Sequence, residues 1–356
     1  MISPPLLEVT GLRKIFPLTK SFSEMLHGGK PRGIHAVDGV NLTVAPGETV
    51  GLIGESGSGK TTLGWTLARL HEPTAGTIRF EGQDITHLKD PGLRRWRRHV
   101  QVVFQDPVGS LDPRLRVWQI VSEPLRAQSS MPSSEARKAV AALLPTVGLP
   151  PDCLFQYPHE FSGGGRQRIS LARALSVNPK MIVLDEPTSA LDVAVQSQIL
   201  NRLVELQRER GLSYLLITHN VAAVRYVADR VAVMYLGQMV EVGSVRDVLE
   251  QPVHPYTKAL IAAVPVADAR RRRARYRVGG DVPTLINPPP GCRFARRCPF
   301  VIDKCRTMDP PLRPIAELPG HLVACHRAEE VLSIPPSSLL ATAESGAPAP
   351  AASLAN

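Results

Sequence analysis

The sequence predicts an α/β fold whose main sheet is covered on both faces, and two observations carry this prediction. Residues 180–187, "KMIVLDEP", form a short continuous apolar run, as in a strand buried on both sides. Residues 54–61, "GESGSGKT", lie between another apolar strand and a helical segment, which is a strand-to-helix unit of such folds. With 356 residues, the chain is long enough for one large domain and a smaller one.

The first part of the chain predicts strands around this glycine-rich segment. Residues 6–16, "LLEVTGLRKIF", predict an edge strand, and residues 19–33 a polar loop insertion. Residues 40–54 alternate in polarity, turn at Pro46–Gly47 and continue as a buried strand. A helix is expected directly after the glycine-rich segment.

The later part of the chain changes character twice. Residues 107–175 are mostly helical and richer in polar residues, whereas residues 212–220 and 230–243 predict further strands. Proline, arginine and cysteine become more frequent from residue 251, so a small irregular domain is expected over residues 251–333. Residues 334–356 are rich in Pro, Ala and Ser and are expected to be disordered.

Charge and hydropathy narrow the class of protein. Six positive charges of the net +10 lie in residues 269–277, "ARRRRARYR", which we interpret as a solvated basic linker, with contact to lipid headgroups or nucleic acid as the alternative. No apolar run approaches the ~20 residues that span a bilayer. The first ten residues lack the basic and apolar regions of a secretory signal, so a cytoplasmic location is expected.

The segment "GESGSGKT" fits the phosphate-loop pattern G-x-x-x-x-G-K-[ST]. Glycines let successive backbone N–H groups point at phosphate oxygens, and the N-terminus of the following helix favours the same anion. Lys60 would reach the β- and γ-phosphates, and the Thr61 hydroxyl would hold Mg²⁺. A glycine turn that fits by chance is the alternative, which the flanking strand and helix disfavour. The candidate nucleotide-binding residues are Gly54, Glu55, Ser56, Gly57, Ser58, Gly59, Lys60 and Thr61.

Polar residues follow three predicted strands. Asp185 suits a Mg²⁺ ligand, and Glu186 suits polarising the attacking water, because both end a buried strand at the edge where the phosphate loop opens. Gln105, in "VVFQDP", could contact Mg²⁺ and this water. A lone histidine after a strand is more often structural, but in a protein with a triphosphate site we interpret His219 as catalytic.

Five segments in this order resemble the nucleotide-binding subunit of an ATP-binding cassette (ABC) transporter: "GESGSGKT", "VFQDP", "FSGGGRQRISLARAL", "VLDEPTSALD" and "ITH". The resemblance covers roughly residues 5–250. It implies a RecA-like P-loop NTPase core with an inserted helical subdomain at about residues 107–175. The helical character of this region agrees with that expectation.

The family's roles then apply to the matching positions. The resemblance adds Thr62 to the phosphate loop and makes Gln105 a sensor of the membrane subunit. It makes Asp185 the Mg²⁺ carboxylate, Glu186 the catalytic base and His219 the switch histidine.

Two further roles follow from the same resemblance. Asp192, in "SALD", resembles the residue that contacts the partner cassette. Phe16 is the candidate for the aromatic ring that stacks on adenine.

The segment "FSGGGRQR" is expected to serve the ATP of a partner cassette. Ser162 can cap a helix, and Gly163 and Gly164 leave N–H groups available for a γ-phosphate. Gly165 stands where the family usually has glutamine. We therefore expect a weakened contact and a dimer whose two ATP sites differ.

The C-terminal region narrows the resemblance. The segments "HPYTKALIAAVP", "PPPGCRFARRCPFVIDKC" and "HLVACH" resemble the C-terminal extension of oligopeptide/dipeptide importer ATPases. In that family the extension can hold a [4Fe–4S] cluster, and four thiolates suffice for one. Zinc is a weaker alternative because the spacing C-x5-C-x6-C-x19-C lacks C-x2-C pairs, and free thiols are another. The candidate ligands are Cys292, Cys298, Cys305 and Cys325.

The resemblance implies an ATP-hydrolysing subunit that powers import of peptides, or of a related small solute, by ATP-driven dimerisation of cassettes. The expected partners are a second ATPase subunit, in a heterodimer, two transmembrane permease subunits and an extracellular solute-binding protein. The expected location is the cytoplasmic face of the membrane.

The alternative is a soluble ABC ATPase that acts on nucleic acid or ribosomes, which the basic run favours slightly. Such proteins commonly carry two cassettes or long coiled-coil insertions. Because neither feature is found in this sequence, no nucleic acid is expected as a partner. An inactive regulatory partner is disfavoured because Lys60, Asp185, Glu186 and His219 are all present.

Overall fold

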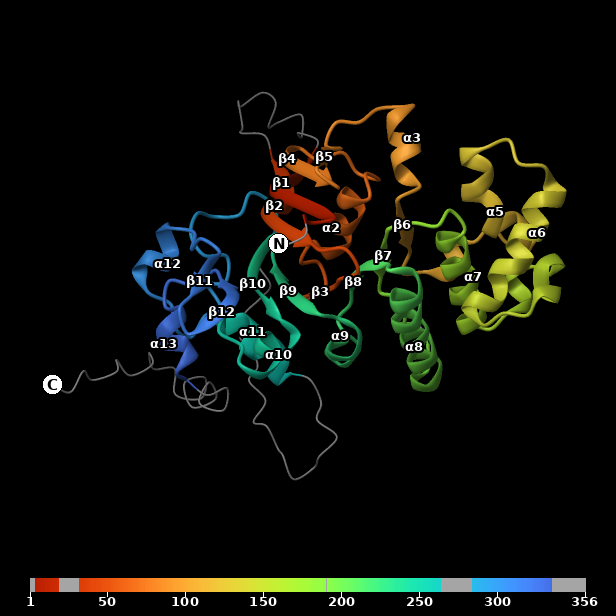
Figure 1. Ribbon diagram of the computed structural model, residues 1–356. Helices are drawn as coiled ribbons and strands as arrows, with labels where there is room; N and C mark the ends of the chain where they lie inside the picture. The colour runs from red at the N-terminus through yellow and green to blue at the C-terminus, as the bar shows by residue number, and fades with distance from the viewer. Residues whose placement is uncertain (1–3, 19–31, 190, 264–283, 335–356) are drawn as a thin grey trace. The chain divides into compact units, whose positions relative to one another are not determined.

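The computed structural model describes residues 4–18, 32–189, 191–263 and 284–334 (Figure 1). Its residues form two compact units, each built from several separate stretches of the chain. The first unit contains the residues up to 12, residues 41–51 and residues 61–229, and the second contains all the others. Within the described part, no helix is long and apolar enough to cross a membrane. The predicted basic linker, the C-terminal tail after residue 334 and residues 19–31 of the predicted insertion lie outside the described residues.

The first unit contains the parallel strands that the apolar runs predict. Strand β7 (Met181–Asp185) lies between β6 (Val100–Val103) and β8 (Ser213–Ile217), and both pairings are parallel. Every residue of β7 and β8 is buried. Strand β3 (Thr49–Ile53) follows β8 in the order and is buried along its whole length. This confirms the α/β class and places the carboxyl ends of β6, β7 and β8 at one edge.

Helices in the first unit take their positions from apolar stripes. Helices α5 (Val117–Gln128), α6 (Ser133–Leu143) and α7 (Gly163–Leu175) belong to the chain segment that connects β6 to β7, and they lie together beside these strands (Figure 1). Their buried residues recur at helical spacing, as in an amphipathic bundle. Short helices complete this region: α4 (Pro107–Ser110) and 3₁₀ turns at Leu144–Val147, Pro151–Phe155 and Pro158–Glu160. Other helices with residues in this unit are α2 (Lys60–Leu67), α3 (Gly92–Arg97), α8 (Val193–Arg210) and α9 (Val221–Val227).

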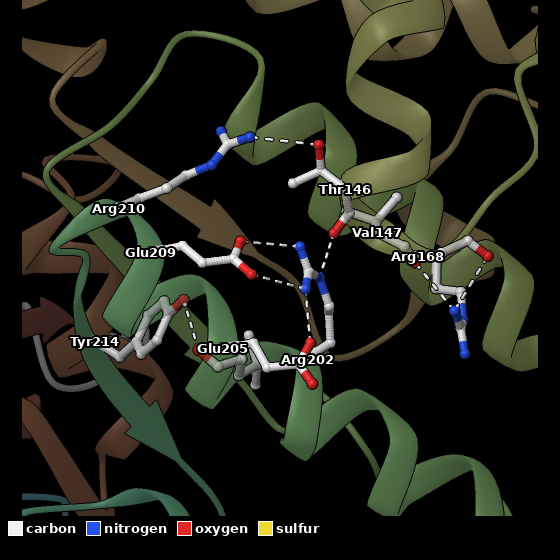
Figure 2. A network of polar contacts seen from close by, with 10 residues as sticks. Thr146, Val147, Arg168, Arg202, Glu205, Glu209, Arg210 and Tyr214 are labelled. Atoms are coloured by element: carbon white, nitrogen blue, oxygen red, sulfur yellow. Dashed lines mark hydrogen bonds and ion pairs between the residues drawn. The ribbon is translucent and has the colours of Figure 1, made fainter.

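A polar network joins this helical region to α8 (Figure 2). Arg202 on α8 donates to the backbone oxygen of Thr146 and forms an ion pair with Glu205 at 2.6 Å. Arg168 on α7 donates to the backbone oxygen of Val147 at 3.1 Å and to Gln198 Oε1 on α8 at 2.9 Å. These contacts fix the direction of α7, whose N-terminus carries the serine–glycine segment.

A separate four-stranded sheet corrects one prediction. Its order is β2 (Gly33–Val44), β1 (Leu7–Pro17), β4 (Ala75–Phe80) and β5 (Gln83–Asp84). The expectation of an edge strand at residues 6–16 is therefore wrong, because β1 has a partner on each side. Alternation in a sequence indicates which face of a strand is buried, but it does not indicate how many neighbours the strand has.

In the second unit, an antiparallel hairpin is extended by the C-terminal residues. Residues 230–243, predicted as strand, form β9 (Arg230–Tyr235) and β10 (Gln238–Ser244) around a tight turn. The turn residues Leu236 and Gly237 have φ of 44° and 84°, as a type I′ turn requires. Strand β12 (Leu318–Val323) pairs with β10, and β11 (Arg313–Ile315) pairs with β12. The short helices are α10 (Val245–Glu250), α11 (Pro255–Ala262), α12 (Asp303–Thr307) and α13 (Ala328–Leu332).

A buried carboxylate attaches the C-terminal residues to β10. The Glu241 side chain has no exposure to solvent and accepts hydrogen bonds from the backbone N–H groups of Val253 and His254. It also bonds His321 Nε2 at 2.7 Å, and His321 is equally buried. Because a buried carboxylate is costly unless several donors reach it, these bonds specify one arrangement of the segment.

His254 gives the second unit a predicted sensitivity to acid. It caps α11 as an acceptor, since its Nδ1 accepts the N–H of Tyr256 at 3.1 Å, and burial lowers its pKa from 6.5 to about 3. The uncharged histidine is therefore the native form, and the unfolded chain binds a proton that the native protein does not bind below pH 6.5. The contribution to stability is full above pH 6.5 and decreases as the pH falls towards 3, by about 1.4 kcal/mol per unit.

The measurement compares urea unfolding of the wild type and of His254→Asn at pH 7.5 and pH 5.0. Asparagine keeps a capping acceptor but does not titrate. We expect the wild type to lose about 2 kcal/mol more than the variant over this interval. Equal losses in the two proteins would contradict a buried neutral His254.

Candidate nucleotide-binding site

The phosphate loop closes around the ammonium group of Lys60. The loop joins β3 to helix α2 (Lys60–Leu67), and Lys60 is only 8% exposed. Its Nζ donates to the backbone oxygens of Gly54 at 2.9 Å and Glu55 at 2.8 Å, and to Ser58 Oγ at 3.3 Å. The backbone curl that the pattern predicts is thus present, with the cation at its centre.

Three glycines of this loop have positive φ: Gly54 at 156°, Gly57 at 77° and Gly59 at 101°. A Cβ atom on Gly54 would lie 2.2 Å from the backbone oxygen of Met234, and one on Gly59 would lie 2.0 Å from that of Ala36. A Cβ on Gly57 would meet nothing within 4 Å. Close backbone packing therefore requires the outer two glycines, whereas conformation alone favours the middle one.

In the first unit, the structure brings together two predicted Mg²⁺ ligands. Asp185 is the last residue of β7 and is 1% exposed. The Thr61 hydroxyl donates to Asp185 Oδ1 at 3.0 Å. A hydroxyl and a carboxylate are oxygen ligands of the kind that Mg²⁺ prefers, so the donor set fits this ion.

Glu186 and His219 form the second pair at this sheet edge. His219 Nδ1 lies 2.8 Å from Glu186 Oε1, and the Glu186 N–H donates to the backbone oxygen of Ile217. Glu186 has a φ of 49°, a left-handed conformation that is costly for a non-glycine residue. Its Oε2 is buried with no hydrogen-bond partner among the described residues. One carboxylate oxygen is thus oriented by histidine, and the other can accept a proton from water.

Two candidate residues are not joined to these pairs. Gln105 lies two residues beyond the end of β6, with an exposed side chain. Phe16 lies on β1, half-buried, with the Lys14 ammonium 4.8 Å from its ring centre. Their expected contacts with Mg²⁺ and adenine stay predictions.

The serine–glycine segment begins α7 as its pattern predicts. Ser162 Oγ accepts the N–H of Gly165 at 3.3 Å. Gly164 is buried, and a Cβ there would lie 2.5 Å from Val195 Cγ1 on α8, so packing against α8 explains this glycine. Asp192 caps α8, since its Oδ1 accepts the N–H of Val195 at 2.9 Å. Gly163 is exposed, and the roles of this segment and of Asp192 towards a partner stay predictions.

The four clustered cysteines are close enough to influence one another. Burial raises the pKa of Cys292 to about 11 and that of Cys325 to about 12. The negative charges of neighbouring cysteine thiolates contribute to both shifts. Burial likewise raises the pKa of Cys298, and the Cys292 N–H donates to the Cys305 oxygen at 2.8 Å. Among the described residues, however, no group of three or more His, Cys, Asp or Glu side chains is arranged to hold a metal ion. The structure therefore gives no support to the expected [4Fe–4S] cluster or to zinc.

Two residues at the phosphate loop were missed by sequence reasoning. The Glu55 N–H donates to the Tyr256 hydroxyl at 2.7 Å, and the Arg297 guanidinium pairs with the Glu55 carboxylate at 3.0 Å. Both partners lie more than 200 residues away along the chain. No local pattern marks them, because the contacts depend on how the C-terminal residues fold back.

Two family models match the chain. One is described as "ABC transporter" and matches residues 37–189. The other is described as "Oligopeptide/dipeptide transporter, C-terminal region" and matches residues 240–305. The second match includes most of β10, all of α11 and three of the four clustered cysteines.

Full-length relatives are similar over most of the chain. A peptide import ATP-binding protein of Brucella ovis is 46% identical over 92% of this chain and 99% of its own length. The oligopeptide transport ATP-binding protein AppF of Bacillus subtilis is 44% identical over 90% of this chain and 97% of its own length.

Solved structures of cassettes have the same fold. CbiO1 from Clostridium perfringens, part of an ABC transporter complex, gives a TM-score of 0.59 at 30% identity over 70% of this chain and 92% of its own. The dimeric ATP-binding cassette MJ0796 in a post-hydrolysis state, with ADP and Pi, gives 0.59 at 29% identity over 67% of this chain and 99% of its own.

Proposed function

The chain belongs to the ABC transporter ATP-binding proteins that carry the oligopeptide/dipeptide transporter C-terminal region, and we propose that it hydrolyses ATP to power import of peptides or a related small solute. The observation that carries the hydrolysis step is the contact between Glu186 and His219. Glu186 directly follows the Mg²⁺ candidate Asp185 in the sequence. The peptide substrate rests on the names of the relatives. None of these comparisons supports the alternative of an ATPase acting on nucleic acid.

Each side chain has a defined task in this reaction. Lys60 neutralises the β- and γ-phosphates, to which the loop N–H groups donate. Thr61 and Asp185 would hold Mg²⁺, which screens the negative charge of the triphosphate. Glu186 Oε2 accepts a proton from the attacking water, and His219 keeps the carboxylate in place through Oε1. The water oxygen bonds to the γ-phosphorus while the bond from this phosphorus to the β–γ bridging oxygen breaks, so the products are ADP and inorganic phosphate.

The proposal includes partners that the chain needs in order to transport. The described residues include no membrane-spanning helix, so the path for the solute is assigned to two permease subunits. A second ATPase subunit forms a heterodimer with this chain, and the serine–glycine segment of each subunit completes the ATP site of the other. An extracellular solute-binding protein delivers the substrate, and this chain lies at the cytoplasmic face of the membrane.

Cell fractionation tests this assembly. We expect a transporter subunit to stay with the membrane fraction through a high-salt wash, because salt screens contacts buried in a subunit interface much less than exposed ones. We expect no nucleic acid in the purified complex. Release of the chain by salt together with bound nucleic acid would support the soluble ATPase instead.

The four cysteines carry a separate proposal, that they hold a [4Fe–4S] cluster. Their number and thiol chemistry suit a cluster, although their arrangement in the structure forms no metal site. Protein purified without oxygen should then be brown and contain iron and sulfide near four per chain. Colourless protein with neither element would overturn this proposal and leave the ATPase proposal unaffected.

Gly165 carries a prediction about the dimer. A glutamine here would add an amide for the partner's ATP, and we expect Gly165→Gln to raise turnover at that site about tenfold. A Cβ at this position would lie 3.0 Å from both Cβ and Cδ1 of Phe161, so this residue must shift slightly. Gly165→Ala is the matched control, since it adds the same Cβ without the amide. Equal ATPase rates for the two variants would exclude a role for the amide.

A further inference from the structure

Arg297, in the cysteine-rich C-terminal extension, contacts the phosphate loop directly. Its guanidinium meets the Glu55 carboxylate with two hydrogen bonds, Nη1 to Oε2 at 3.0 Å and Nη2 to Oε1 at 3.2 Å. The Arg297 side chain is 7% exposed and that of Glu55 30%. Paired, charge-assisted bonds of this geometry are among the strongest polar contacts in proteins, and they fix orientation as well as distance.

Aromatic residues support this pair from within the same unit. The Tyr235 hydroxyl accepts a hydrogen bond from Arg297 Nη1 at 3.2 Å, and the Tyr256 hydroxyl accepts the backbone N–H of Glu55 at 2.7 Å. The rings of Tyr235, Tyr256 and Phe294 contact one another, with centroids 4.6 to 5.6 Å apart. The backbone and the side chain of Glu55 are therefore both held by residues beyond position 230.

The backbone carbonyl of the same residue, Glu55, orients the ammonium group of Lys60. Lys60 Nζ donates to the Glu55 backbone oxygen at 2.8 Å, so a shift of Glu55 would also move the oxygen that orients Lys60. Burial lowers the pKa of Arg297, but its hydrogen bonds with Glu55 and Tyr235 raise that pKa by more, so the guanidinium stays charged. The contact thus forms a continuous path from the extension to the residue that binds phosphate.

We propose that Arg297 is a positioning residue for ATP: by holding Glu55 it sets the shape of the phosphate loop, so that the C-terminal extension controls the nucleotide affinity of its own chain. This proposal depends on the proposed function in one respect only, which is that the nucleotide bound by the phosphate loop is ATP. It assigns the extension a role at the ATP site that requires no metal at the cysteines.

A mutant cycle tests the pair in the full-length chain. Titration with a fluorescent ATP analogue gives the Kd of the wild type, Arg297→Gln, Glu55→Gln and the double variant. We expect each single variant to bind about tenfold more weakly, which is about 1.4 kcal/mol. The double variant should bind no more weakly than the weaker single variant, because both remove the same contact. Arg297→Lys should recover only part of the affinity, since lysine lacks the planar fork.

The control variant is Arg313→Gln. Arg313 forms the same two-pronged pair with Glu329, at 2.6 and 2.8 Å, elsewhere in the extension, and we expect its loss to leave Kd unchanged. Steady-state kinetics should show the Arg297→Gln effect in KM, with kcat within about twofold, because Glu186 and His219 keep their own contacts.

Two results would overturn the proposal. One is an Arg297→Gln protein that binds the analogue as tightly as the wild type while its melting temperature falls, which would make the pair purely structural. The other is additive losses in the double variant. A wild-type chain that binds ATP but never hydrolyses it would instead contradict the proposed function, and the binding cycle would still decide the role of Arg297.

Discussion

Glu186→Gln is expected to lower ATP turnover by about 10²–10⁴-fold, the range typical for loss of a general base. Glutamine has nearly the same shape as glutamate but cannot take a proton from water. The strained backbone at Glu186 and its buried Oε2, which has no hydrogen-bond partner among the described residues, support this proposed role. ATP affinity should stay within about threefold of the wild type, because the variant leaves unchanged the residues proposed to bind the phosphates, Lys60 and the loop glycines.

The histidine partner gives this experiment its control. His219→Ala removes the hydrogen bond to Oε1 but leaves a carboxylate able to accept a proton. Its loss of turnover should therefore be smaller than that of Glu186→Gln. Release of phosphate under saturating ATP and Mg²⁺ measures both variants. If the glutamine variant kept more than a third of the wild-type rate, Glu186 could not be the base.

Gly59→Ala is expected to destabilise the second unit by more than about 3 kcal/mol. Its φ of 101° is unfavourable for any residue with a Cβ, and that Cβ would lie 2.0 Å from the Ala36 oxygen and 3.0 Å from Met234 Cε. Backbone atoms cannot move aside as a flexible side chain can. The free energy of unfolding, measured in urea, should fall by this amount, and ATP binding should be lost with it.

Gly57→Ala separates conformation from crowding. Gly57 has a φ of 77° in the same loop, but a Cβ there meets nothing within 4 Å. Only the conformational cost of about 1–2 kcal/mol applies. Equal destabilisation by the two substitutions would show that the contact of the loop with residues 36 and 234 does not constrain it.

The local features of the fold could be predicted from the sequence because their signals are local. A continuous apolar run identifies β7, and the carboxyl ends of parallel strands share an edge. The contacts of Thr61 with Asp185 and of Glu186 with His219 follow from this, whereas their roles in catalysis stay predictions. The alternation before Pro46–Gly47 likewise predicted the end of β2 and the start of β3.

Features that depend on distant partners could not be predicted in this way. The internal position of β1 depends on β4, and the need for glycine at residue 164 depends on Val195. The turn at Leu236–Gly237 was missed because leucine is unusual at positive φ. The Arg297–Glu55 pair joins residues 242 positions apart, which no pattern in a single sequence reveals.

Uptake of a labelled peptide by cells tests the central claim most directly. Cells that carry the complete transporter are compared when this chain is wild type and when it carries Glu186→Gln, at equal amounts of protein in the membrane fraction. ATP-driven peptide import predicts accumulation of peptide with the wild type and almost none with the variant. Equal accumulation in the two strains, with the variant shown to be inactive as an ATPase, would contradict the account.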